Sequence, residues 1–170
     1  MSERALANAG VRFPPPLLFV AGLALAALLD RLRPAPLWHG GGRPVAFLVA
    51  AAVLLGAGAV WMAWGLITFR RARTAVIPNR PASSLVTGGP YRFGRNPMYL
   101  GMTTAYCGAT LWLDSAWAIV MLPIVIDLLH RLVIRREEAY LADAFGAEYE
   151  RYRGRVGRWL SLSAPPPRAP

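Results

Sequence analysis

The chain has 170 residues, the length of one domain, and 55% of them are hydrophobic. A soluble domain of this size has no interior large enough for long apolar runs, so the composition indicates an integral membrane protein. The formal net charge of +10 comes from arginine without any lysine, and because these arginines flank the apolar runs, the positive-inside effect explains them better than nucleic-acid binding does.

Four apolar runs divide the chain and predict an all-α integral membrane bundle of about four transmembrane helices. They cover residues 15–29, 44–69, 97–113 and 116–134. The first run leads into Asp30 and Arg31 rather than into small residues at a cleavage site, so we expect a retained span and not a signal peptide. Pro123 lies inside the fourth run and predicts a kink there.

A two-residue turn separates the third run from the fourth. It consists of Asp114 and Ser115, and both are residue types that cap helices. So short a connection predicts a tight helical hairpin.

Small residues mark the second and third runs. Gly101, Ala105 and Ala109 share one helix face, which allows close approach of a neighbouring helix, and we expect the fourth run to be that neighbour. We interpret Gly56-Ala57-Gly58 as helix-packing residues and not as a nucleotide fingerprint, because no strand precedes them. The single cysteine, Cys107, excludes an intrachain disulfide and a cysteine-based zinc site.

The charges of the connecting segments predict how the chain is oriented. Six arginines lie in residues 70–95, seven follow Ile134, and the Asp114-Ser115 turn has none. Three arginines between the first and second runs oppose this pattern. The majority predicts an inner or plasma membrane protein with both termini and the long linker in the cytoplasm.

The segment from Glu137 to Val156 predicts an amphipathic α-helix. Apolar residues recur there at spacings of three and four: Leu141, Phe145, Tyr149, Tyr152 and Val156. Gly146 weakens this helix and is a candidate position for a break. We therefore divide the chain into two spans with a cytoplasmic linker (1–84), a C-terminal half with the hairpin and the amphipathic helix (85–160), and a disordered tail (161–170).

Ionisable residues lie in the fourth run and in the helix expected to continue it. On one straight helix at about 100° per residue, one stripe holds Asp127, Arg131, Ile134, Glu138 and Leu141. Asp127 and Arg131 are spaced as an ion pair, and His130 is interpreted as an interfacial residue. Glu138 is expected to face the bundle, while Glu137 diverges from the stripe.

The basic turn from Gly88 to Gly101 precedes the third run. Asn96 and Pro97 are preferred residue types at the start of a helix, so a structural role explains them. The same helix start offers N–H groups to an anion, and the rings of Tyr91 and Tyr99 suit a base or a cation.

Together these motifs resemble the isoprenylcysteine carboxyl methyltransferase and phospholipid methyltransferase superfamily. The resemblance spans residues 85–159 and is carried by Gly89-Pro90-Tyr91, Arg95 to Gly101, Glu137-Glu138, and Phe145-Gly146 with Tyr149 and Tyr152. The family commonly has Arg-His-Pro at the turn, whereas this chain has Asn96, so a role that needs an imidazole is not carried over.

The resemblance implies a membrane-integral methyltransferase that uses S-adenosylmethionine without a Rossmann domain. The implied cofactor-binding residues are Gly89, Tyr91, Arg95, Asn96, Pro97, Tyr99, Gly101, Glu137, Glu138, Tyr149 and Tyr152. No catalytic residue or metal site is assigned. The acceptor would be lipophilic, such as an isoprenylcysteine-like carboxylate, and would enter from the bilayer.

Two alternatives stay open. An NADPH-dependent membrane sterol or enone reductase resembles the same C-terminal half, but such proteins are usually longer. A non-enzymatic protein that binds anionic membrane lipids through its arginines would explain the charge alone.

Overall fold

The computed structural model describes residues 9–11, 14–73 and 82–160. The regular elements in these ranges are helical: α1 (Pro16–Leu32), α2 (Val45–Arg71), the 3-10 helix η1 (Gly89–Arg92), α3 (Pro97–Leu113), α4 (Ala116–Leu129), the π-helix η2 (His130–Ile134) and α5 (Arg135–Arg155). The predicted all-α class is therefore confirmed for the described residues. The predicted tail, residues 161–170, lies outside them.

Two helices are long and apolar enough to cross a membrane. They are α2, with 27 residues, and the 40 helical residues from Ala116 to Arg155, which comprise α4, η2 and α5 and are interrupted by a kink at Gly146. Helices α1 and α3 have 17 residues each. Four transmembrane helices therefore remain a prediction, of which the structure supports two by length and composition.

The chain divides into two compact units. The first, which we call the span unit, comprises described residues 14–60 and 101–135. The second, which we call the motif unit, comprises described residues 9–11, 61–73, 82–100 and 136–160.

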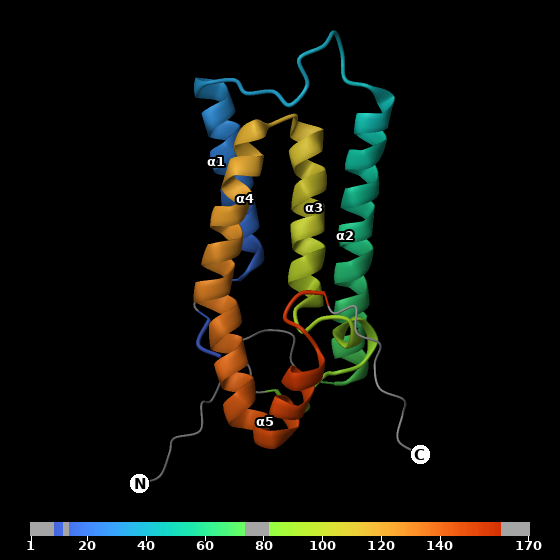
Figure 1. The fold of residues 1–170 in the computed structure, drawn as a ribbon, viewed down its shortest axis with the longest axis vertical. Helices are drawn as coiled ribbons and strands as arrows, with labels where there is room; N and C mark the ends of the chain where they lie inside the picture. Colours follow the sequence, from blue (N-terminus) through green and yellow to red (C-terminus); the bar gives the residue numbers. More distant parts are fainter. Residues whose placement is uncertain (1–8, 12–13, 74–81, 161–170) are drawn as a thin grey trace. The chain divides into compact units, whose positions relative to one another are not determined.

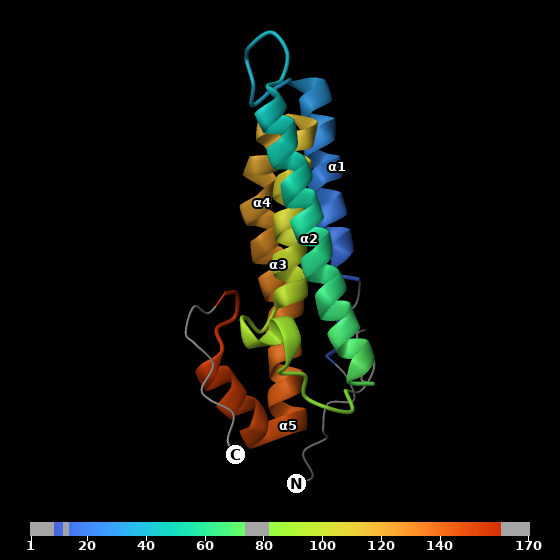
Figure 2. The same cartoon turned by 90° about the vertical axis from the view of Figure 1, so that its right-hand side faces the viewer.

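In the span unit, α1 packs along α4 (Figures 1 and 2). A Cβ atom added to Gly22 of α1 would lie 2.5 Å from Cγ2 of Val125 in α4, so the missing side chain permits the close approach. Phe19 of α1 meets Tyr106 of α3 edge to face, with ring centroids 6.2 Å apart. An aromatic pair thus joins α1 to α3 beside the α1–α4 contact.

Helices α2 and α3 approach each other through glycines. A Cβ atom on Gly58 of α2 would lie 2.6 Å from the carbonyl oxygen of Gly101 and 2.6 Å from the amide nitrogen of Ala105. A Cβ atom on Gly108 would lie 2.8 Å from the carbonyl oxygen of Ala51. The prediction that Gly101 and Ala105 face the fourth run is wrong, because Gly58 removes the side chain on the α2 side and lets the two backbones meet there.

The turn between α3 and α4 is tight, as predicted. Asp114 has a positive φ of 57°, which ends α3. Ser115 is the N-cap of α4, and its hydroxyl accepts a hydrogen bond from the amide of Ala118. Helix α4 continues through Pro123.

Two irregularities change the course of the long last helix. The π-helical turn η2 adds a residue to the helix, so residues after it are rotated relative to those before it. The predicted single stripe is therefore wrong: Arg131 and Asp127 are 67% and 51% exposed, whereas Glu138 is 16% exposed. At Gly146, with φ of 48° and ψ of −123°, α5 breaks and turns back (Figure 1), as its sequence suggested.

Candidate functional site

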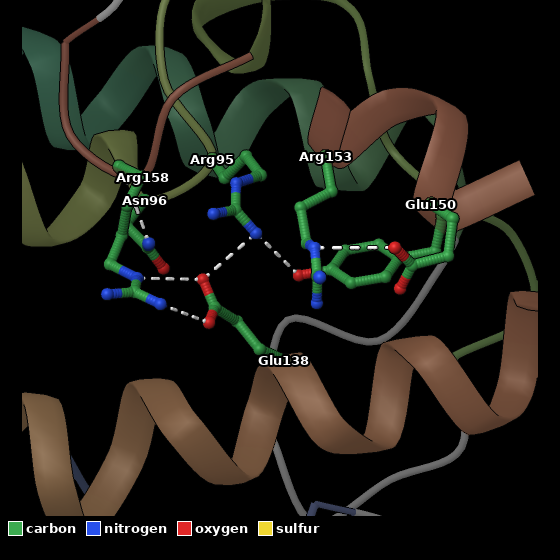
Figure 3. Close-up of polar contacts among 7 residues, drawn as sticks. Arg95, Asn96, Glu138, Glu150, Arg153 and Arg158 are labelled. Atoms are coloured by element: carbon green, nitrogen blue, oxygen red, sulfur yellow. Dashed lines mark hydrogen bonds and ion pairs between the residues drawn. The ribbon is translucent and has the colours of Figure 1, made fainter. Parts of the chain in front are cut away.

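Glu138 of α5 lies between two arginines in the motif unit (Figure 3). The guanidinium of Arg158 donates to both carboxylate oxygens, from Nε to Oε1 at 2.9 Å and from Nη2 to Oε2 at 2.7 Å. Arg95 contributes a third contact, Nη1 to Oε1, at 3.0 Å. The fork of Arg158 on a carboxylate is a strong and directional interaction, and it raises the pKa of Arg158 above its ordinary value.

Arg95 is nearly buried, with 10% of its side chain exposed. Its Nη1 also donates to the phenol oxygen of Tyr149 at 2.9 Å. Its Nε is buried and has no hydrogen-bond partner among the described residues. A buried guanidinium N–H without an acceptor costs free energy, and an anionic or hydroxylic ligand would satisfy it.

Residues 157–159 lie against the turn that begins α3. The amides of Arg95 and Asn96 donate to the carbonyl oxygens of Gly157 and Arg158, at 2.9 and 3.2 Å. The side-chain amide of Asn96 donates to the same Arg158 carbonyl at 3.0 Å. Helix α3 starts at Pro97, which confirms the helix start that Asn96 and Pro97 predicted.

Glu137 has a different environment from Glu138. Its Oε1 accepts a hydrogen bond from the hydroxyl of Tyr99 at 2.7 Å. Glu137 lies beyond Ile134, where the apolar part of the last helix ends. Burial, and to a lesser degree the charge of Glu138, raise the pKa of Glu137 to about 7, although the Tyr99 hydrogen bond opposes the shift.

Both acidic residues therefore contact residues 95–99, which we call the motif turn. We expected Glu138 to face the bundle and Glu137 to diverge from it. The structure gives each carboxylate a partner from residues 95–99. The expectation about Glu137 is wrong because η2 and the start of α5 change the rotation that a straight helix would give.

Tyr91 and Tyr152 join the turn to the second half of α5. The hydroxyl of Tyr152 donates to the carbonyl oxygen of Tyr91 at 2.8 Å, and Tyr91 stacks edge to face on Phe69 of α2. Burial raises the pKa of both tyrosines above the ordinary value, so both stay neutral. Gly89 has a φ of +57°, and a Cβ atom there would lie 2.5 Å from the hydroxyl of Thr68.

The predicted site residues are thus brought together, with one exception. All except Gly101 lie in the motif unit, where hydrogen bonds or ion pairs join Arg95 to Glu138 and Tyr149, Tyr99 to Glu137, and Tyr91 to Tyr152. Gly101 lies in the span unit and packs against α2. The sequence reasoning missed Arg158, because only the position after the amphipathic helix marks it and its contact with Glu138 depends on the break at Gly146.

The other ionisable candidates have structural surroundings. Arg131 pairs with Asp127 at 2.9 Å, as their spacing predicted, and both side chains are exposed. His130 begins η2. No group of three or more potential metal ligands occurs among residues 9–11, 14–73 and 82–160.

Comparison with known proteins identifies a family. Residues 46–148 match the family described as phospholipid methyltransferase. A 63-residue uncharacterized protein of Haemophilus influenzae is 41% identical over its whole length, which corresponds to 37% of this chain. No solved structure matches the chain significantly.

Two named relatives are more distant. The cobalt-zinc-cadmium resistance protein CzcN of Cupriavidus metallidurans is 35% identical over 77 residues, 44% of this chain and 36% of that protein. The protein-S-isoprenylcysteine O-methyltransferase of Schizosaccharomyces pombe is 35% identical over 78 residues, 46% of this chain and 33% of that protein. The matched segment therefore spans about a third of the length of each named relative.

Proposed function

This chain belongs to the phospholipid methyltransferase family, and from that premise we propose that it transfers a methyl group from S-adenosylmethionine to a lipophilic acceptor at a membrane. Family membership supports an enzyme of the membrane methyltransferase class. The observation that carries the finer proposal is the cluster in which Arg95, Tyr99 and Asn96 of one turn meet Glu138, Glu137 and residues 157–159.

The residues of the cluster fit the polar groups of the proposed cofactor. The unpartnered Nε of buried Arg95 suits the carboxylate of the methionine moiety. Glu138 and Glu137 can accept hydrogen bonds from the ribose hydroxyls, as acidic residues do in dinucleotide sites. The rings of Tyr91, Tyr99, Tyr149 and Tyr152 would contact the adenine or the sulfonium cation.

Bound S-adenosylmethionine would supply an electrophilic methyl group on a sulfonium. The methyl group would pass to a lone pair of the acceptor, with S-adenosylhomocysteine as the other product, while Arg95 and Glu138 would hold the cofactor's polar groups. Charge disperses in this step, so a dry and oriented site favours it. A carboxylate acceptor carries no proton and needs no general base.

The acceptor is proposed as a lipid-like molecule, for example an isoprenylcysteine-like carboxylate. The apolar helix α2 and the apolar residues 116–134 suit an acceptor that enters from the bilayer. We propose that the polar cofactor enters from the cytoplasm, because most of the arginines lie in the segments predicted to face it.

The proposal is tested by ligand binding to the purified protein in nanodiscs. S-adenosylhomocysteine should raise the thermal unfolding midpoint, whereas NADPH should not. Stabilisation by NADPH alone would instead indicate the reductase alternative. Mass spectrometry after incubation with isotopically labelled S-adenosylmethionine and host lipid extract would identify the acceptor.

Glu138→Gln tests the placement of the cofactor. We expect a loss of affinity for S-adenosylhomocysteine of roughly tenfold by calorimetry, the size expected when a hydrogen bond to a charged group is lost. The matched control is Glu148→Gln, an exposed residue of α5. Equal affinities in the two variants would contradict the proposed role of Glu138.

A further inference from the structure

The three residues Gly157, Arg158 and Trp159, which we call the C-terminal strap, are held on the motif turn by main-chain contacts. The carbonyl oxygens of Gly157 and Arg158 accept from the amides of Arg95 and Asn96. A Cβ atom added to Gly94 would overlap the carbonyl oxygen of Trp159. The turn thus accepts the strap only because residue 94 has no side chain.

The side chain of Arg158 takes no part in that attachment. The strap's acceptors are backbone oxygens, and the third donor to them is the side-chain amide of Asn96. The guanidinium of Arg158 is therefore available to bind Glu138, which it does through both carboxylate oxygens (Figure 3). Attachment of the strap and orientation of Glu138 are two separable functions of one residue.

The orientation of the Glu138 carboxylate decides which hydrogen bonds it can accept, because the two lone pairs of each oxygen have fixed directions in the carboxylate plane. A two-point contact with Arg158 fixes the plane of the Glu138 carboxylate, and the contact from Arg95 uses one further lone pair. The fork therefore sets the direction in which the carboxylate presents its lone pairs. Loss of Arg158 would remove the two-point contact that fixes this plane.

We propose that Arg158 is a positioning residue that orients Glu138 for the cofactor, and that the strap closes over the motif turn to hold it there. This inference rests on the proposed function, since it assigns Glu138 to cofactor binding. Arg158 acts through Glu138 and has no direct role in the methyl transfer. Its loss should raise the Kd and KM for the cofactor and leave kcat almost unchanged.

The first experiment compares arginine variants of the full chain in nanodiscs, with S-adenosylhomocysteine as the probe. We expect Arg158→Gln to weaken binding roughly tenfold and Arg158→Lys to weaken it less, because lysine keeps the charge but not the fork. The matched control is Arg155→Gln, since Arg155 is exposed and its Nε donates to the carbonyl of Arg151 within α5. Equal affinities of the Arg158→Gln and Arg155→Gln variants would overturn the proposal.

A double variant tests whether Arg158 acts through Glu138. The variant with both Glu138→Gln and Arg158→Gln should bind no more weakly than Glu138→Gln alone, because the positioned group is already gone. Losses that multiply would show that Arg158 acts independently, which would overturn its assignment as a positioning residue.

The last experiment needs no ligand and addresses the strap itself. Gly94→Ala should displace the strap and speed tryptic cleavage after Arg158, while cleavage after Arg135 and Arg136 in α5 stays slow. The control is Gly154→Ala, where an added Cβ meets nothing within 4 Å. Equal cleavage rates of the Gly94→Ala variant and wild type would contradict the attachment of the strap to the motif turn. Failure of the wild type to bind S-adenosylhomocysteine would instead overturn the proposed function.

Discussion

Glu137 and Glu138 are neighbours in the chain but have opposite electrostatic surroundings. Two guanidinium groups, those of Arg95 and Arg158, contact Glu138. Glu137 meets the neutral phenol of Tyr99 and is mostly removed from water, which favours its protonated form. One carboxylate is therefore held between two cations, whereas the other changes its charge near neutrality.

The titration of Glu137 predicts a pH-dependent stability. Its folded-state pKa of about 7 lies above the ordinary value of 4.5, so the folded protein binds the proton more tightly and loses stability as pH rises between these values. Glu137→Gln removes this loss and keeps an acceptor for Tyr99. We expect equal thermal midpoints of variant and wild type near pH 4.5, and a midpoint several degrees higher for the variant at pH 8. A difference that is independent of pH would contradict the buried state of Glu137.

Asn96 shows how a residue expected at a helix start acquires a second partner. Its side-chain amide donates to the carbonyl of Arg158. Asn96→Leu removes this donor at similar size, and cleavage after Arg158 by trypsin should become about fivefold faster, as loss of about 1 kcal/mol from strap attachment implies. Asn96→His should retain slow cleavage, because an imidazole N–H can donate instead. Equal rates for the leucine and histidine variants would show that the donor is unimportant.

At the scale of elements, local signals predicted where helices begin, and tertiary contacts decided the rest. Pro97 after Asn96 and Ser115 before Ala116 mark helix starts by their own backbone chemistry, and both starts are confirmed. The π-turn η2 leaves no sequence signal, because i to i+5 hydrogen bonds form where packing rotates the helix. The strap could not be predicted either, because its partners are more than 50 residues away along the chain and only tertiary contacts bring them together.

Helices α2 and α3 provide a matched pair of glycines for a test of their packing. Gly58→Ala places a Cβ 2.6 Å from backbone atoms of Gly101 and Ala105, and backbone atoms cannot rotate away. We expect the clash to lower the free energy of unfolding by about 1–3 kcal/mol, as overpacking does. Gly56→Ala, two residues away with nothing within 4 Å, should be neutral or stabilising because alanine favours the helix. Thermal unfolding of both variants measures the contrast, and similar midpoints would contradict the α2–α3 contact.

At the scale of the molecule, hydrogen bonds within the span unit link two connections that are distant in sequence. The carboxylate of Asp114, in the turn after α3, accepts from the amides of Leu37 and Trp38 in the segment after α1. The amide of Ala116 donates to the carbonyl of Ala35. The two connections therefore lie at the same end of the span unit. Helix α2 begins after the first connection and α3 ends before the second. Because both connections lie at one end, α2 and α3 run in opposite directions, as two successive crossings of a membrane would.

This arrangement makes the predicted orientation testable despite the opposing arginines after α1. The orientation predicted from the arginines puts the long linker and Gly154 in the cytoplasm, and it puts Gly41 and Asp114 on the opposite side of the membrane. We expect a membrane-impermeant maleimide to label Gly41→Cys in intact cells and to label Gly154→Cys only after lysis, in a Cys107→Ala background. Both glycines are exposed and an added Cβ meets nothing within 4 Å at either, so access alone controls the reaction. Labelling of Gly154→Cys alone in intact cells would reverse the orientation, and labelling of both would contradict an odd number of crossings between these positions.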